Sequence, residues 1–131
     1  MQHVHCSATT ADEQVTDHGE VTCEQALTIV SQFPWAAQNA RSQQTGVGPS
    51  VSFGFQGGER TYLNLVGLEG ESLMVMMEVV LKPGFLGILS RKAASLEKDL
   101  SSAHEAMVYV QKLYELDRDA LYEWVRSRAH P

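Results

Sequence analysis

The sequence lacks the features that would direct the chain into or across a membrane. No apolar run approaches the about 20 residues that a membrane-spanning helix requires. The first turns of the chain have neither a basic start nor an apolar core, so no export signal is recognisable. Only two cysteines occur, Cys6 and Cys23, and without an export signal we expect both to be reduced thiols. These absences predict a soluble cytoplasmic protein that makes no membrane contact.

Positive charge is also scarce. The chain has 10 Lys and Arg residues against 16 Asp and Glu, a formal net charge of -6, and residues 1–40 contain no Lys or Arg. A nucleic-acid-binding protein needs a basic stripe that neutralises phosphates, so we expect no nucleic acid partner. Most of the excess acidic residues lie near the N-terminus, so we attribute the negative net charge mainly to an N-terminal tail.

Catalytic motifs are missing as well. The glycines Gly54, Gly57 and Gly58 end a predicted strand, with neither the Lys-Ser/Thr nor the helix that a phosphate-binding loop needs. There is no Gly-x-Ser-x-Gly motif, and His104 lies at a predicted helix start, where a solvated histidine is usual. We therefore expect a protein that is not an enzyme and needs no cofactor.

What remains is the composition of one globular domain. The chain has 131 residues, of which 44% are hydrophobic and 20% charged. Residues 1–21 are polar and without periodicity, which predicts a flexible tail, followed by a single α+β domain over 22–131. The tail holds His3, His5 and Cys6, a zinc-type ligand set, but structural zinc sites show paired ligand spacings at both ends, so we predict no metal site.

The first predicted helix begins at Thr22. Residues 22–25 have the form of a capping box, and apolar side chains then recur along one stripe to Phe33. Pro34 suits a first helical position, so a second short helix is predicted over 34–41 with Trp35 buried near the bend. A loop over 42–49 follows.

The surest sheet signal spans residues 50–82. Ser50 to Phe55 alternates polar with apolar, and residues 60–67 and the run up to Lys82 read as two strands joined by a three-residue loop that ends at Gly70. That loop pairs Leu65 with Leu73, Asn64 with Met74, Tyr62 with Met76 and Arg60 with Glu78. A two-residue turn at Gly57 and Gly58 would place Phe53 beside Tyr62.

The C-terminal part is predicted to be helical. Residues 85–89 form either a turn of helix or an edge strand, and leucines at helical spacing predict a helix over 91–99. A second capping box at 102–105 opens the strongest helix, and Asp117 either caps a final helix or lies on one continuous helix. The prediction is an α+β fold with a three-stranded antiparallel meander, or four-stranded with 85–89, an N-terminal helix and two or three C-terminal helices.

The candidate site is the second face of the meander. A sheet covered on one side should have a polar outer face, yet this face holds apolar side chains. Five of its residues are our candidate partner-binding residues: Tyr62, Asn64, Met74, Met76 and Glu78. Either the protein's own helices cover both faces, or the second face binds a protein partner or another copy of the chain.

In size, mild acidity, lack of catalytic motifs and α+β plan, the chain resembles bacterial toxin-immunity proteins and secretion chaperones, a resemblance of type without a shared motif. It implies a non-enzymatic protein-binding module, for example an immunity-type inhibitor that uses the sheet face and the 42–49 loop. One alternative is a secretion-chaperone-like dimer. Another is a small-ligand-binding protein or enzyme with a pocket between sheet and helices, lined by Trp35, Tyr62, Tyr114 and Trp124.

Overall fold

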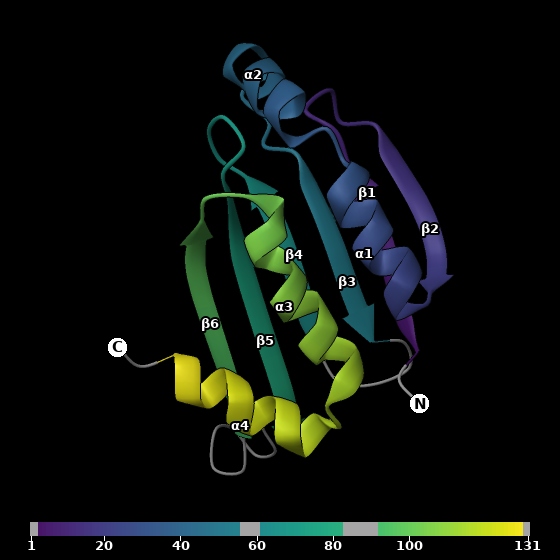
Figure 1. Cartoon of the computed structure of the whole chain (residues 1–131), viewed down its shortest axis with the longest axis vertical. Coiled ribbons are helices and arrows are strands. Elements are labelled where there is room, and N and C mark those ends of the chain that lie inside the picture. The colour runs from purple at the N-terminus through teal and green to yellow at the C-terminus, as the bar shows by residue number, and fades with distance from the viewer. Residues whose placement is uncertain (1–2, 56–60, 83–91, 130–131) are drawn as a thin grey trace.

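An antiparallel sheet of six strands forms one layer of the molecule, and four helices form the other (Figure 1). This computed structural model describes residues 3–55, 61–82 and 92–129. The elements follow the chain in this order: β1 (Val4–Thr9), β2 (Val15–Val21), α1 (Cys23–Gln32), α2 (Trp35–Thr45), β3 (Ser50–Phe55), β4 (Tyr62–Gly67), β5 (Leu73–Lys82), β6 (Lys92–Leu100), α3 (Ala103–Glu115) and α4 (Arg118–Arg128). The predicted α+β class is confirmed, but the sheet has more strands than the predicted meander.

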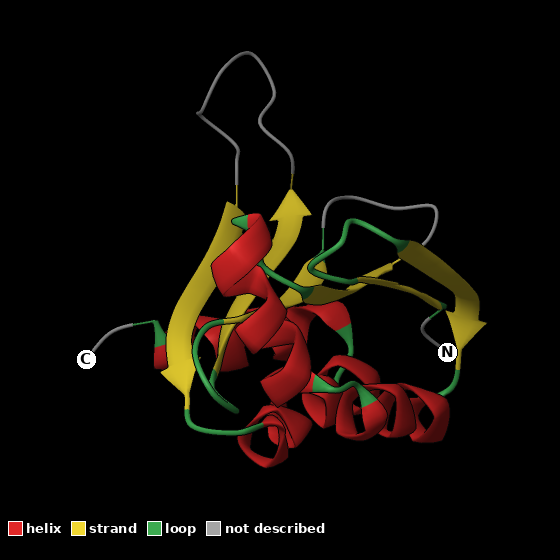
Figure 2. Ribbon diagram, turned by 90° about the horizontal axis from the view of Figure 1, so that it is seen from above, coloured by secondary structure: helices red, strands yellow, loops and turns green. Residues whose placement is uncertain are grey.

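The strand order across the sheet is β2-β1-β3-β4-β5-β6. Strands β3 to β6 form a meander, and β1 extends it by pairing with β3 from Val4 opposite Phe55 to Thr9 opposite Ser50. Helices α1 and α2 fill the connection between β2 and β3. Viewed from above, α1, α3 and α4 gather on one side of the sheet, and α2 stands across its end (Figure 2). We call the side that they cover the covered face and the other side the open face.

The core lies between the covered face and the helices. Alternate residues of the strands point into it, because successive side chains of a strand point to opposite faces. In β5, for example, Leu73, Val75, Met77 and Val79 are buried. Helices α1, α3 and α4 contribute small and aliphatic residues such as Ala26, Val30, Val110, Leu121 and Val125. Removal of this apolar surface from water is the main force that holds the two layers together.

The predicted start of α1 is confirmed. The Thr22 hydroxyl accepts a hydrogen bond from the Gln25 backbone N–H at 3.1 Å, and the Gln25 side-chain oxygen accepts one from the Thr22 N–H at 2.8 Å. Trp35 is buried at the bend after α1, where its indole N–H donates to the Val30 carbonyl at 3.0 Å. These bonds satisfy backbone groups that a helix end would otherwise leave orphaned.

Helix α2 runs one turn further than predicted, so residues 42–45 are helical and the loop before β3 is short. Gly46 ends the helix at a φ of 77°, a left-handed conformation that favours glycine. The helix lies at the end of the sheet, where the Asn39 side-chain amide donates to the Gly70 carbonyl at 2.8 Å and to the Ser72 carbonyl at 3.0 Å. Gly67 is required there, since a Cβ atom would lie 1.9 Å from Asn39 Oδ1.

The C-terminal helices are separate rather than continuous. The Asp117 carboxylate accepts a hydrogen bond from the Ala120 N–H at 2.8 Å, which confirms Asp117 as the cap of α4. The capping box predicted at 102–105 is wrong, because Ser102 makes no side-chain cap. The Ser101 N–H instead donates to the Glu105 carboxylate at 2.8 Å.

The described part of the predicted N-terminal tail, residues 3–21, is largely strand. Residues 4–9 and 15–21 form β1 and β2, with Val4 and Cys6 fully buried in the core. The inward positions of β1 are small or weakly apolar, and β2 is an exposed edge strand without alternation, so neither showed a clear period. The predicted helix over 91–99 is also wrong, because this segment is the edge strand β6, paired with β5. Tertiary pairing overrides its helix-favouring composition.

Two predicted registers are wrong. Leu63 pairs with Met77 and Asn64 with Met76, a slip of two residues that keeps every side chain on its predicted face. The reason is a longer turn, in which the Leu68 N–H donates to the Ser72 carbonyl at 3.0 Å. Gly70 still has the predicted positive φ, 60°. Between β3 and β4 the slip is one residue, so Phe53 pairs with Leu63 in the core and not with Tyr62.

Several predictions fall on parts of the chain that the structure does not describe. The turn at Gly57 and Gly58, the residue Arg60 and the connector 85–89 lie outside the described residues. The partner of Glu78 on β4 is Tyr62. Within the described ranges, each helix is too short or too polar to cross a lipid bilayer.

Candidate functional site

The open face of the sheet is built from the outward residues of all six strands. Strand pairing arranges them in three rows, each written here from β2 to β6. The first row is Val15, Thr9, Ser50, Val66, Met74 and Asp99. The second row is Asp17, Ser7, Ser52, Asn64, Met76 and Glu97. The third row is Glu20, His5, Gly54, Tyr62, Glu78 and Ser95.

These rows divide the open face into three zones. The neighbouring strands β1 and β3 carry four Ser or Thr side chains, one glycine and His5. Beside them, β4 and β5 carry the larger side chains Tyr62, Val66, Met74 and Met76. Both edge strands carry carboxylates, Asp17 and Glu20 on β2 and Glu97 and Asp99 on β6. The open face is therefore an apolar ridge and a band of short side chains between two acidic edges.

The structure places all five candidate partner-binding residues on the open face. Each of these side chains is half-buried, and each lies on the face opposite to the buried strand residues that pack against the helices. Of the two alternatives left open by the sequence, cover by the protein's own helices on both faces is not found in the described part of the chain. The five residues on this face are Tyr62, Asn64, Met74, Met76 and Glu78.

A shallow hollow of about 430 Å³ lies on the open face near β6. Its walls come from three of the candidate residues, Tyr62, Met76 and Glu78, from Ser95 and Glu97, and from the largely buried Met77 and Leu96 between them on the strands. Ala129, at the end of α4, closes one side of it. No described lysine or arginine side chain forms an ion pair with either glutamate of the hollow. The hollow thus combines an aromatic ring, a thioether and two carboxylates that no lysine or arginine of the described ranges pairs with.

Part of the predicted loop adjoins the open face. The Pro49 carbonyl accepts a hydrogen bond from the Gly67 N–H at 2.8 Å, which holds the loop against the end of β4. A methyl group on Gly48 would lie 3.5 Å from Cγ1 of Val66, so the loop borders the ridge. Residues 46–49 can therefore contribute to a contact made on the open face, whereas 42–45 belong to α2.

Sequence reasoning missed the acidic edges because it placed their residues in a tail and in a helix. On β2, the Asp17 carboxylate lies 2.8 Å from Nε2 of His5, and the Glu20 carboxylate lies 3.0 Å from Nδ1 of His3. The acids of the N-terminal segment are thus fixed on the sheet. The alternation of Val4, Cys6 and Ala8 was the one signal that could have found β1.

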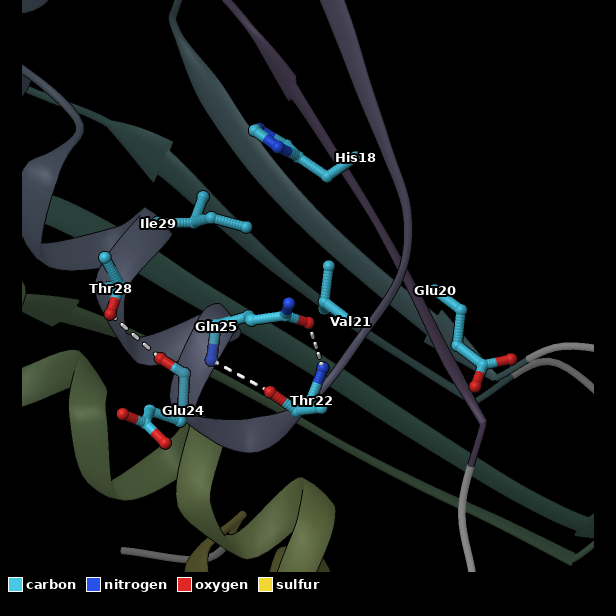
Figure 3. A pocket seen from close by; sticks show the side chains of 8 residues that line it. All are labelled: His18, Glu20, Val21, Thr22, Glu24, Gln25, Thr28 and Ile29. Carbon is cyan, nitrogen blue, oxygen red and sulfur yellow. Dashed lines mark hydrogen bonds between the residues drawn. The ribbon is translucent and has the colours of Figure 1, made fainter.

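A second hollow, of about 530 Å³, opens between the end of β2 and the start of α1 (Figure 3). Its lining includes His18, Glu24 and Ile29, and the capping box of α1 forms its floor. The polar groups of that box are bonded to one another, and the Thr28 hydroxyl donates to the Glu24 carbonyl at 3.0 Å. The Glu20 side chain points away from α1. Few polar groups remain to converge on a ligand there.

The predicted ligand set of His3, His5 and Cys6 is not brought together. Cys6 points into the core on the covered face, whereas His5 lies on the open face beside Asp17. Across residues 3–55, 61–82 and 92–129, no group of three His, Cys, Asp or Glu side chains is placed to hold a metal ion.

The two thiols are poorly suited to nucleophilic chemistry. Burial, and secondarily the Asp17 carboxylate, raises the pKa of Cys6 from 9.0 to about 12. Burial and the Glu115 carboxylate raise the pKa of Cys23 as well. The nearby Tyr114 hydroxyl, whose pKa burial also raises, donates to the Val21 carbonyl at 2.8 Å. A thiol reacts as its thiolate, so both cysteines are held in the unreactive form at neutral pH.

The aromatic residues predicted to line one pocket are separated. Tyr62 is on the open face, while Trp35, Tyr114 and Trp124 lie in the helical layer on the other side of the sheet. Trp124 packs edge-on against Tyr109, with ring centroids 5.6 Å apart, and Arg128 stacks over its ring. These contacts are those of ordinary packing.

Comparison of the chain with protein-family models, with curated proteins and with solved structures gives no significant match.

Proposed function

We propose that this protein is a non-enzymatic binding module that recognises a partner protein through the open face of its sheet. The observation that carries the proposal is the placement of α1, α3 and α4 on one side of the sheet, with α2 across its end. It leaves Tyr62, Val66, Met74 and Met76 half-buried on the other face, without a described helix packed over them. Exposed apolar patches of this kind, rimmed by polar groups, mark interaction sites.

The composition and size of the open face support a protein partner rather than a small ligand. Tyrosine and methionine are enriched in the centres of protein interfaces, and methionine adapts its shape to the surface it meets. The three rows supply eighteen residues across the full width of the sheet, close to the about 20 residues that each partner contributes to a standard interface. An immunity-type inhibitor is one protein that would use such a face, and the loop 46–49 would border the contact.

Site-specific photo-crosslinking in the native cell tests this proposal. A photoreactive amino acid at Met76 should give a discrete covalent adduct with one partner protein. The same amino acid at Val108, an exposed residue of α3 on the helical side, should give none. Adducts from Val108 alone would overturn the proposal.

A substitution in the middle of the open face gives the second test. Met76→Arg should abolish the adduct formed from position 64 while leaving thermal unfolding nearly unchanged, because Met76 is only half-buried. A large loss of stability would place Met76 in the core instead. Unchanged crosslinking in a stable variant would show that the partner does not use this face.

The small-ligand alternative has less support. In the hollow beside α1, the side chains of Thr22 and Gln25 are engaged in capping and are not free to bind a ligand. Its side chains include no described trio of metal ligands. The open face remains the better candidate.

A further inference from the structure

We infer that the occupant of the open face is an arginine-bearing segment of a partner protein, whose guanidinium group enters the hollow formed by Tyr62, Met76, Glu78 and Glu97. This inference rests on the proposed function and names the chemistry of its partner. It is argued from the charge of the face, the shape of the hollow and the residues that line it.

The charged side chains of the three rows on the open face are mainly acidic. Five of its eighteen positions are carboxylates and none is lysine or arginine. The nearest described basic residues of β6 point to the other side of the sheet, Lys98 opposite Val75 and Lys92 over the ring of Tyr122 at 5.0 Å. The complementary partner is therefore basic.

The same charge argues against a second copy of this chain as the occupant. A symmetric dimer formed through this face would place the same surface against itself, bringing two sets of these carboxylates together. Like charges across an interface cost several kcal/mol. The face is thus built for a different protein that carries the opposite charge.

The carboxylates, the aromatic ring and the thioether of the hollow suit an arginine side chain. Glu78 on β5 lies directly opposite Ser95 on β6, and Glu97 is two residues beyond Ser95 on β6. The two carboxylates are therefore diagonal neighbours on one face of the sheet. Neither carboxylate forms an ion pair with a described lysine or arginine, although Lys98 and Arg128 line a smaller hollow beside Glu97. A guanidinium group has donors for both carboxylates and can stack on the Tyr62 ring, while its aliphatic stem lies along Met76.

Arginine fits this hollow better than lysine. The planar guanidinium group can donate to two carboxylates at once and stacks on aromatic rings, whereas an ammonium group is a compact and strongly hydrated charge. The remaining apolar side chains of the ridge, Val66 and Met74, would contact the residues that flank the arginine.

The test uses two peptides and the intact protein. One peptide is a capped five-residue segment with a central arginine between leucines; its twin has citrulline, which keeps the shape and removes the charge. Titration into isotope-labelled protein, followed by amide NMR shifts, should show binding of the arginine peptide at Tyr62, Met76, Glu78 and Glu97. We expect the citrulline twin to bind about tenfold more weakly or not at all.

Variants of the protein provide the second arm. Glu78→Gln with Glu97→Gln should weaken binding of the arginine peptide by about tenfold or more. The matched control, Asp119→Asn with Glu123→Gln, changes the net charge equally on the outer face of α4 and should leave affinity unchanged. If the two double variants weaken peptide binding equally, the peptide is attracted by the net charge of the protein alone. That result would overturn the proposed pocket.

The outcomes separate this inference from the proposed function. If photo-crosslinks from position 76 persist but the citrulline peptide binds as well as the arginine peptide, the face is a protein-binding surface without an arginine pocket. Loss of the crosslinks as well would remove the proposed function. Self-association that depends on Met76 would make a second copy the occupant and overturn the inference.

Discussion

The two faces of the same sheet differ sharply although they are built from the same strands. Along β5, Leu73, Val75 and Met77 are buried against the helices, whereas the residues between them, Met74 and Met76, are half-exposed on the open face. On the covered face every position is constrained by packing. The open face carries no helix and is therefore free to hold carboxylates and a hollow that packing would forbid.

This contrast separates the residues that make the fold from those that are available for recognition. The covered face is continuous across β1, β3, β4 and β5, with Val51, Phe53, Leu63 and Leu65 fully or almost fully buried. On the open face the same strands carry hydroxyls, an amide and a carboxylate beside the apolar ridge. Substitutions that compare neighbouring residues on the two faces can break or sharpen the contrast.

The largest effect is expected from the adjacent methionines of β5. Met77→Ala should lower the free energy of unfolding by about 2–5 kcal/mol, because Met77 is 1% exposed and its removal leaves a cavity. Met76→Ala should cost less than about 1 kcal/mol, since its side chain is half-exposed. Urea unfolding of both variants measures the two values. Equal losses would show that the open face is packed as tightly as the covered face.

Much of this contrast could be predicted from the sequence between residues 60 and 82. The two-residue period of β4 and β5 assigns each side chain to a face, and the slip of two residues in their pairing does not change that assignment. The five candidate residues were therefore placed on one face correctly. The exact pairing between β4 and β5 depends on the length of the turn that joins them, and the sequence did not determine that length.

The edges of the sheet could not be predicted in the same way. An edge strand such as β2 has water on both faces for most of its length, so its sequence needs no alternation. In β6, Leu96 and Leu100 are four residues apart, a spacing that suits a helix as well as a strand. The acidic edges were missed because Asp17, Glu97 and Asp99 lie on these two strands.

An intermediate loss of unfolding free energy is expected at the end of the sheet, where α2 is hydrogen-bonded to the β4–β5 turn. Asn39→Ala should cost about 2 kcal/mol, because it removes two hydrogen bonds to the Gly70 and Ser72 carbonyls from a side chain that is 1% exposed. Gln38→Ala, which removes a single hydrogen bond from the Ala11 N–H, should cost about half as much. Thermal unfolding and amide NMR spectra measure stability and local change.

The location of the changes is as informative as their size. Amide shifts caused by Asn39→Ala should be confined to α2 and the turn, with the rows of the open face unchanged. Shifts that spread to Met76 and Glu97 would show that the two faces are not independent.

The smallest effect is expected from Cys6, which lies on the covered face of β1 next to Ser7 on the open face. Its pKa is raised from 9.0 to about 12 by burial and by Asp17. The stability that follows from this shift is fully present below pH 9, and it is lost as the pH rises from 9 toward 12, because the unfolded chain then releases a proton that the folded chain retains. At pH 10 the loss is about 1 kcal/mol.

Cys6→Ala should remove this part of the pH dependence, so the difference in unfolding free energy between pH 8 and pH 10 should shrink by about 1 kcal/mol relative to the unchanged protein. Tyr114, whose pKa is also raised, will keep part of the alkaline decline in the variant. Cys23→Ala serves as the control, since Cys23 is only half-buried and should alter the slope less. An unchanged slope in Cys6→Ala would mean that the folded protein ionises Cys6 as readily as the unfolded chain. Water would then reach the covered face at β1, and the contrast between the two faces would fail at that strand.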